Sequence, residues 1–141
     1  MMTRPITLLS LMAMSLFGCA TASHHSPAPA PPPWPEGVSK ECPQRDRHLE
    51  CFRSAEIRQA MWGLRERFNA CHPFTPEPVK VILKLETLGG SPTCVEASPA
   101  ASPAAACLTD VIAHHFKIPG SRSDEPCSLD YPILFNLSDH E

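Results

Sequence analysis

The spacing of apolar residues predicts two helices. Between residues 55 and 70, apolar side chains recur at steps of four, three, four and three, which places them on one helical face: Ile57, Met61, Leu64, Phe68 and Cys71. Ser54 is the expected N-cap, with Glu56 favourably placed in the first turn. The second helix is expected to start at Ser102-Pro103, because serine caps helices well and proline suits the first helical position. Its apolar face would consist of Ala104, Cys107, Leu108, Val111, Ile112 and His115.

Two other stretches alternate with the period of a half-buried strand. Residues 79–86 place Val79, Val81, Leu83 and Leu85 on one side, and residues 127–135 do the same with Leu129, Tyr131, Ile133 and Phe135. Pro132 cannot donate to a ladder, so it should lie at an edge or a bulge. A turn at residues 89–92 lets residues 93–97 return as a shorter strand. The order helix, strand, strand, helix, strand predicts an α+β fold, with a small antiparallel sheet of about three strands and two helices on one face.

The first eighteen residues have the layout of a secretory signal peptide: a basic start at Arg4, an apolar run over residues 6–17 and small residues after it. The run is well short of the ~20 residues needed to span a bilayer. Leu16-Phe17-Gly18-Cys19 resembles the bacterial lipobox, in which the cysteine becomes the lipidated first residue of the mature chain. No Asp follows Cys19, so the predicted location is the outer membrane, facing the periplasm. The alternative is an ordinary secreted protein cut near residues 20–22, which would discard Cys19.

The remaining chain divides into three predicted parts. Residues 19–37 comprise the lipidated cysteine and a proline-rich tether, which lacks the apolar side chains and backbone donors that a packed core requires. Trp34 leaves open that this tether is a proline-rich ligand for a partner. Residues 38–54 form a polar loop bounded by Cys42 and Cys51, which are close enough in sequence to pair locally. Residues 55–141 form the folded domain.

Cysteine content points to an oxidising compartment. With Cys19 set aside, six cysteines remain, and an even number in a short exported chain indicates a disulfide framework: Cys42, Cys51, Cys71, Cys94, Cys107 and Cys127. Six cysteines allow 15 connectivities, and the sequence does not choose among them. No Cys-x-x-Cys is present, which removes the usual spacing of thiol redox enzymes and the commonest spacing of zinc knuckles.

Charge and candidate chemistry add little. The formal net charge is −3, and acidic and basic residues are interleaved, so no nucleic-acid partner is expected. The arginines of residues 45–67 are interpreted as a solvated helix face. His114 and His115 are about 100° apart on a helix and cannot both face one metal ion; His115 is expected to be partly buried and His114 to lie in solvent. Asp110 and His114 should form a surface ion pair. No nucleophile lies in a Gly-x-Ser-x-Gly or comparable setting, so no catalytic, metal or cofactor site is predicted.

The order of elements resembles a known family. A helix ending at Phe68-Asn-Ala-Cys71 precedes a strand, a Gly-Gly turn and a second strand. Ala106-Cys107-Leu108 then lies on a helix that runs into Phe116-Lys-Ile-Pro119, and the last strand ends at residues 131–135, Tyr-Pro-Ile-Leu-Phe. Residues 56–135 thus resemble the TonB-like C-terminal domain of the AgmX/PglI type, found in envelope proteins of gliding myxobacteria. The resemblance implies a non-enzymatic, periplasmic, protein-contacting module in which Cys71 and Cys107 are bonded to each other.

The chain also departs from that family. A TonB-type transducer begins with a membrane-spanning helix, which a lipidation signal replaces here. Four further cysteines lie outside the family pattern: Cys42, Cys51, Cys94 and Cys127. The prediction is therefore a lipid-anchored protein-binding module that needs no cofactor. Another envelope protein would bind by strand addition along an open edge at Thr93, Val95 and Ala97. The alternatives are a metal- or haem-handling lipoprotein with Cys and His ligands, and a small envelope enzyme.

Overall fold

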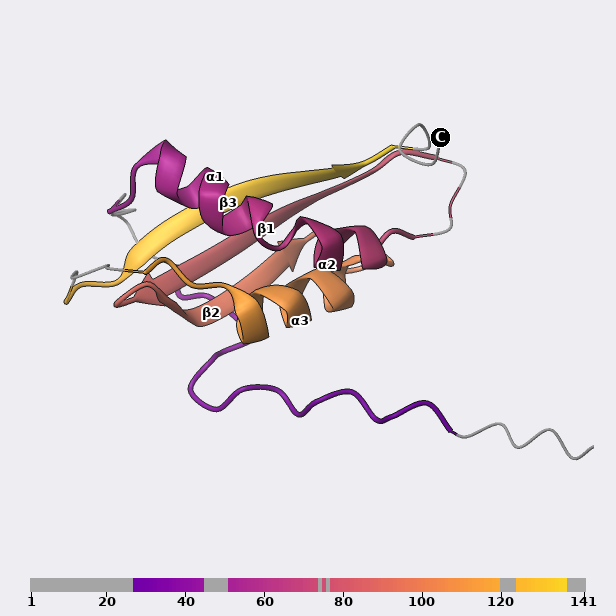
Figure 1. Ribbon diagram of the computed structural model, residues 1–141, viewed down its shortest axis with the longest axis horizontal. Helices are drawn as coiled ribbons and strands as arrows, with labels where there is room; N and C mark the ends of the chain where they lie inside the picture. Colours follow the sequence, from indigo (N-terminus) through magenta and orange to yellow (C-terminus); the bar gives the residue numbers. More distant parts are fainter. Residues whose placement is uncertain (1–26, 45–50, 74, 76, 120–123, 137–141) are drawn as a thin grey trace, which may run out of the picture. The chain divides into compact units, whose positions relative to one another are not determined.

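The computed structural model describes residues 27–44, 51–73, 75, 77–119 and 124–136, so the predicted lipidation site at Cys19 lies outside the described residues. The chain divides into two units, residues 1–31 and Pro32–Glu141. Residues 27–31 of the first unit are described, and all of them are exposed. The second unit contains the helices and strands (Figure 1). It begins before the end of the predicted tether and takes in residues 32–37.

A three-stranded antiparallel sheet forms the centre of the second unit. It consists of β1 (Val79–Leu88), β2 (Ser91–Ser98) and β3 (Cys127–Phe135), in the spatial order β2-β1-β3. A two-residue turn joins β1 to β2, and both of its residues need positive φ: Gly89 at 60° and Gly90 at 81°. This is the requirement of the tight turns that match strand twist. Pro132 lies in β3, whose hydrogen-bonded neighbour among the described strands is β1, so its predicted edge position is confirmed.

The first helical stretch is broken into α1 (Ser54–Trp62) and α2 (Arg65–Ala70), where one helix was predicted. The predicted inward face is nevertheless retained, with Met61, Leu64, Phe68 and Cys71 buried and Ile57 partly buried. The predicted cap at Ser54 is wrong. Arg53 occupies the N-cap position, and its N–H donates to a Glu56 carboxylate oxygen 2.8 Å away, so Glu56 serves the helix start from inside the first turn.

The second predicted helix is α3 (Ala105–His115), which begins three residues after Ser102. Residues 102–104 form a turn instead, in which the Ser102 hydroxyl accepts a bond from the Ala104 N–H at 3.4 Å. Leu108 and Ile112 are fully buried on the inward face, as predicted. The predicted burial of the two histidines is reversed: His115 is exposed, whereas the His114 side chain is 16% exposed and packs against the N-terminal segment.

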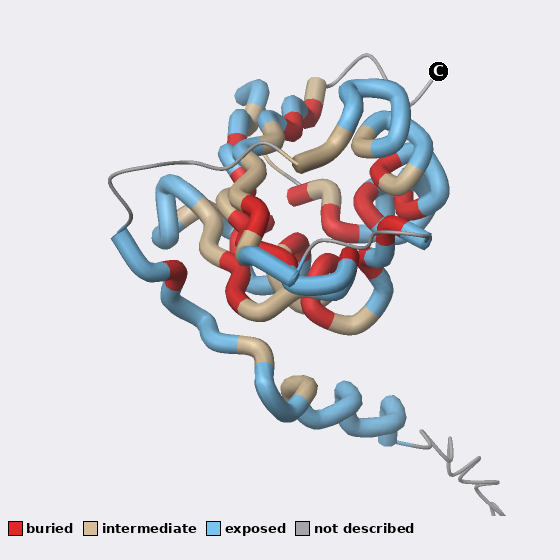
Figure 2. Tube along the Cα trace, turned by 90° about the vertical axis from the view of Figure 1, so that its left-hand side faces the viewer, coloured by how far each residue is buried: buried red, intermediate tan, exposed pale blue. Residues whose placement is uncertain are grey.

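The core lies between one face of the sheet and the three helices (Figure 2). The register sets Leu83 opposite Ala97 on β2 and Tyr131 on β3, so the inward-pointing residues of all three strands form one surface. The helices cover that surface, while the opposite face exposes apolar side chains such as Ile82 and Leu134. The predicted α+β class, with an antiparallel sheet and helices on one face, is confirmed.

Candidate functional site

Three disulfide bonds cross-link the chain: two join the segments before α1 to the edge strands, and the third joins α2 to α3. Cys42 bonds to Cys94 in β2, Cys51 to Cys127 in β3, and Cys71 at the end of α2 to Cys107 in α3. The local Cys42–Cys51 bridge considered from the sequence is therefore not formed. The Cys71–Cys107 bond that the resemblance implied is present, with Cα atoms 5.5 Å apart.

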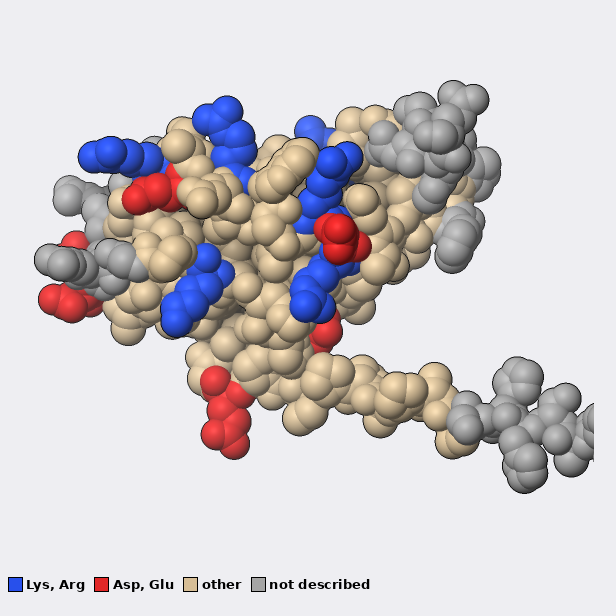
Figure 3. Space-filling view, in the orientation of Figure 1, with Lys and Arg blue, Asp and Glu red and all other residues tan. Residues whose placement is uncertain are grey.

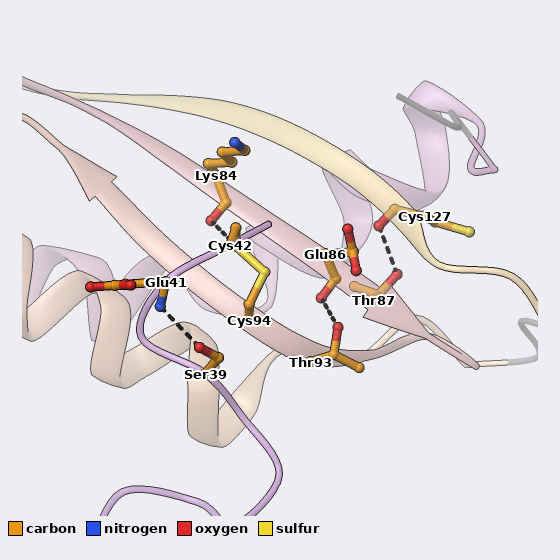
Figure 4. The surroundings of a disulfide bond; sticks show 9 residues. All are labelled: Ser39, Glu41, Cys42, Lys84, Glu86, Thr87, Thr93, Cys94 and Cys127. Carbon is orange, nitrogen blue, oxygen red and sulfur yellow. Dashed lines mark hydrogen bonds between the residues drawn. A yellow bond between two sulfur atoms is a disulfide. The ribbon is translucent and has the colours of Figure 1, made fainter. Parts of the chain in front are cut away.

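The Cys42–Cys94 bond brings the N-terminal segment onto the edge of the sheet. Cys94 lies opposite Glu86, so its side chain points to the face that the helices leave uncovered. Figure 4 shows the segment passing across that face, where Cys42 Sγ lies 3.7 Å from the carbonyl oxygen of Lys84. Cys94 and Glu86 are buried beneath it.

The edge predicted for strand addition is partly occupied by this same segment. The Ser39 N–H donates to the Thr93 carbonyl at 2.8 Å, and the Val95 N–H donates to the Ser39 carbonyl at 3.0 Å, which makes a short parallel bridge. The pairing goes no further, because the Glu41 N–H turns back to the Ser39 hydroxyl at 3.2 Å (Figure 4). Thr93 and the donor of Val95 are thus already used, whereas Ala97 lies beyond the bridge.

The orientation of the Val95 N–H shows which groups of β2 point outward. It bonds to Ser39 and not to β1, and alternate residues of a strand present their backbone groups to the same edge. The Ala97 N–H and the carbonyls of Val95 and Ala97 therefore also point away from β1. They face a groove of about 520 Å³ between the N-terminal segment, β2 and α3. Its lining includes small side chains, Trp34 and a set of charged residues, namely Lys40, Glu41, Glu96 and Asp110.

Trp34 forms part of the wall of this groove. Its indole N–H donates to the Val38 carbonyl at 2.7 Å, its ring meets His114 edge-on at 6.4 Å, and the Lys40 ammonium lies 4.9 Å from the ring centre. This contact was not predicted from the sequence. Gly37 is the sequence signal that could have predicted it, because glycine favours the third position of such a turn. In the structure Gly37 has φ of 79°, and the Val38 N–H donates to the Pro35 carbonyl to close the turn.

His114 joins α3 to the N-terminal segment. Its Nδ1 lies 2.9 Å from the Asp110 carbonyl oxygen, and its Nε2 lies 2.9 Å from the Pro33 carbonyl oxygen. Both partners are acceptors, so both ring nitrogens can donate only when the imidazole is protonated. These two bonds raise the pKa of His114 above its usual value, and the predicted ion pair with Asp110, at 3.3 Å, adds to the effect. Loss of solvation and the nearby Arg67 lower the pKa of His115.

Other kinds of site were sought among the same residues. Within the part of the chain that the structure describes, no three His, Cys, Asp or Glu side chains converge as a metal site would require. No helix in those residues is long and apolar enough to cross a membrane. Comparisons with family models, with curated proteins and with solved structures give no match.

Proposed function

We propose that this protein is a non-catalytic, lipid-anchored module of a bacterial envelope, facing the periplasm, that binds another envelope protein along the outer edge of β2. The observation that carries the proposal is the set of outward-pointing backbone groups at Val95 and Ala97. They lie beside a groove large enough for an extended chain, just where the bridge to Ser39 stops. An extended segment can bond to such an edge, and the pockets beside it can select its side chains.

Two further observations support the cellular setting. The lipobox-like sequence ending at Cys19 favours anchoring through an N-terminal lipid. The other six cysteines are bonded in pairs, which suits an oxidising compartment such as the periplasm. The resemblance to the TonB-like AgmX/PglI domain favours a protein partner. It does not favour energy transfer, because the lipidation signal stands where a transducer has its membrane-spanning helix.

The charges around the groove favour a basic partner segment. Three carboxylates, on Glu41, Glu96 and Asp110, line it together with the single ammonium of Lys40. The lining also includes small side chains such as Ala97 and Ala106. A segment carrying Lys or Arg would be drawn to this groove by opposite charge.

The decisive experiment is a proline substitution at Ala97. Ala97→Pro removes an outward N–H while leaving the ladder to β1 in place, because the groups that bond to β1 belong to the alternate residues. We expect capture of the partner from envelopes to fall at least tenfold. Ala97→Ser keeps the donor and should bind as the parent does.

Both variants should show three intact disulfide bonds and an unchanged circular dichroism spectrum. If Ala97→Pro, folded by these criteria, captured the same partner with the same affinity, strand addition at β2 would be disproved.

For the alternative function, metal or haem handling, the cysteines are not available as thiolate ligands. All six cysteines of the described residues are bonded in three pairs, so a site in the oxidised protein would have to use histidines and carboxylates. Metal analysis of the purified oxidised protein separates the two proposals, since a handling protein would retain a stoichiometric ion.

A further inference from the structure

An arginine–tryptophan surface lies on the outward side of the first two helices. Trp62, the last residue of α1, is 69% exposed although it is the largest side chain of the helix. Arg58 precedes it by one turn and Arg65 follows it, with the guanidinium carbon 4.8 Å from the centre of the indole ring. The inward sides of the same helices bury Met61 and Leu64. The three exposed residues therefore form a continuous outward surface, here called the Arg58–Trp62–Arg65 surface.

Charge is distributed unevenly around this surface. All the arginines among the described residues lie between Arg53 and Arg67. Glu56 is engaged at the start of α1, which leaves Glu66 as the other carboxylate of these helices. Carboxylates outnumber lysines in the rest of the described chain. Figure 3 shows several basic side chains projecting where Figure 1 places α1 and α2, with few acidic ones among them.

The chemistry of these side chains fits one kind of partner. Tryptophan prefers the boundary between water and lipid, because its ring is apolar and its N–H seeks a polar neighbour. Arginine binds phosphate oxygens through its planar fork of donors. An exposed indole between two guanidiniums matches the headgroup layer of a bilayer, where phosphates and acyl chains meet. Packing of the Arg65 guanidinium on the indole also holds the two side chains ready for that contact.

We propose that the Arg58–Trp62–Arg65 surface rests on the headgroups of a bilayer that contains anionic lipids. The contact is shallow, because one aromatic side chain reaches outward while the apolar residues of both helices face the core. It fixes which side of the domain faces the membrane and leaves the β2 groove, which lies elsewhere on the unit, free for a partner. The proposal does not depend on partner binding or on a lipid at Cys19.

Quenching of tryptophan fluorescence by brominated phospholipids tests the contact in the full oxidised chain. Vesicles of phosphatidylcholine are compared with vesicles that also contain about one third phosphatidylglycerol, with bromine on the acyl chains. We expect quenching in the anionic vesicles, weakening as salt is added. Trp62→Phe should abolish it, since Trp34 packs within the folded unit and serves as the unquenched reference. Arg58→Gln/Arg65→Gln should lower the affinity for anionic vesicles, measured from the quenching, by about tenfold or more. The reason is that each basic residue near the surface contributes about fivefold to that affinity.

The matched control is Lys80→Gln/Lys84→Gln, which removes the same charge from the opposite face of the sheet. It should leave quenching unchanged. Equal loss in both double variants would mean a general charge effect and would overturn the proposal. Quenching in anionic vesicles that is unchanged in Arg58→Gln/Arg65→Gln would also overturn it. Binding to a soluble anionic polysaccharide without any lipid quenching would assign the surface to a polymer and would equally overturn it.

Discussion

At the scale of single residues, His114 is the most informative side chain. Two backbone carbonyls, of Asp110 on α3 and Pro33 on the N-terminal segment, each lie 2.9 Å from one of its ring nitrogens. The charged and titratable groups around it are the Asp110 carboxylate, the His115 imidazole and, across the Trp34 ring, the Lys40 ammonium. The neutral ring has a single N–H and can keep only one of these two hydrogen bonds, so protonation strengthens the link between α3 and the N-terminal segment.

This dependence predicts a pH effect of definite sign. The pKa of His114 is raised in the folded state, so its stabilising contribution is complete below the unfolded value of about 6.5 and disappears as pH rises through the folded value. We expect Trp34 fluorescence to shift over that range as the segment loosens, and the free energy of unfolding to fall slightly. His114→Leu should remove the transition.

The neighbouring histidine supplies the control. His115 is exposed and its pKa is lowered, so His115→Leu should leave the Trp34 transition in place. A transition that persists unchanged in His114→Leu would show that another group controls the segment.

At the scale of secondary structure, the break between α1 and α2 is the clearest departure from prediction. Gly63 ends α1 with ordinary helical dihedrals, and Leu64 follows with φ of −100° and ψ of 0°. The apolar face continues across the break, with Leu64 buried like its neighbours. Periodicity therefore predicted the face and missed the break, because a single glycine within a helical pattern is a weak local signal.

A pair of glycine substitutions tests which glycines need their flexibility. A Cβ at Gly63 would meet carbonyl oxygens at 3.5 and 3.7 Å, which is ordinary contact, and its φ of −61° suits any residue. We expect Gly63→Ala to raise the free energy of unfolding by about 0.5–1 kcal/mol. Gly89→Ala should lower it by about 1–2 kcal/mol, because φ is +60° there. Urea denaturation measures both, and destabilisation by Gly63→Ala would contradict the first expectation.

Strands were the easiest elements to predict. The alternation over residues 127–135 gave the bounds of β3, and the inward residues of β1 are those expected from the period of two. The bridge at Ser39 could not be foreseen, because a contact made by one residue leaves no periodic pattern. For the same reason the sequence indicated an open edge at Thr93 and Val95 without showing that residue 39 occupies it.

At the scale of the whole molecule, the disulfide bonds decide how the segments before α1 belong to the fold. Cysteine parity predicted that the six would pair, and the resemblance implied one pair. The other two bonds join residues separated by 52 and 76 positions, which no local spacing reveals. Connectivity depends on which strands become edges, and that is settled only when the sheet is assembled.

Removing one bond should show how much the cross-links contribute. For Cys42→Ala/Cys94→Ala, the chain-entropy model predicts a loss of about 4 kcal/mol in the free energy of unfolding, because the closed loop is long. Chemical denaturation under non-reducing conditions measures it. The Cys71–Cys107 bond closes a shorter loop of 36 positions, so Cys71→Ala/Cys107→Ala should lower the free energy of unfolding by slightly less. A loss below about 1 kcal/mol in the first variant would mean that the N-terminal segment is held without its bond.

The Cys42–Cys94 bond also sets how the domain responds to mechanical force. A pull applied upstream of Pro33 first meets non-covalent contacts, at His114, Trp34 and Ser39, which yield one after another. Their release frees about nine residues, 33–41, whose fully extended length is roughly 30 Å. The pull then stops at a covalent bond to β2, which is hydrogen-bonded along its length to β1. The segment before Cys42 therefore extends under force before the sheet bears any tension. Because this segment lines the groove beside Ala97, the groove changes shape first.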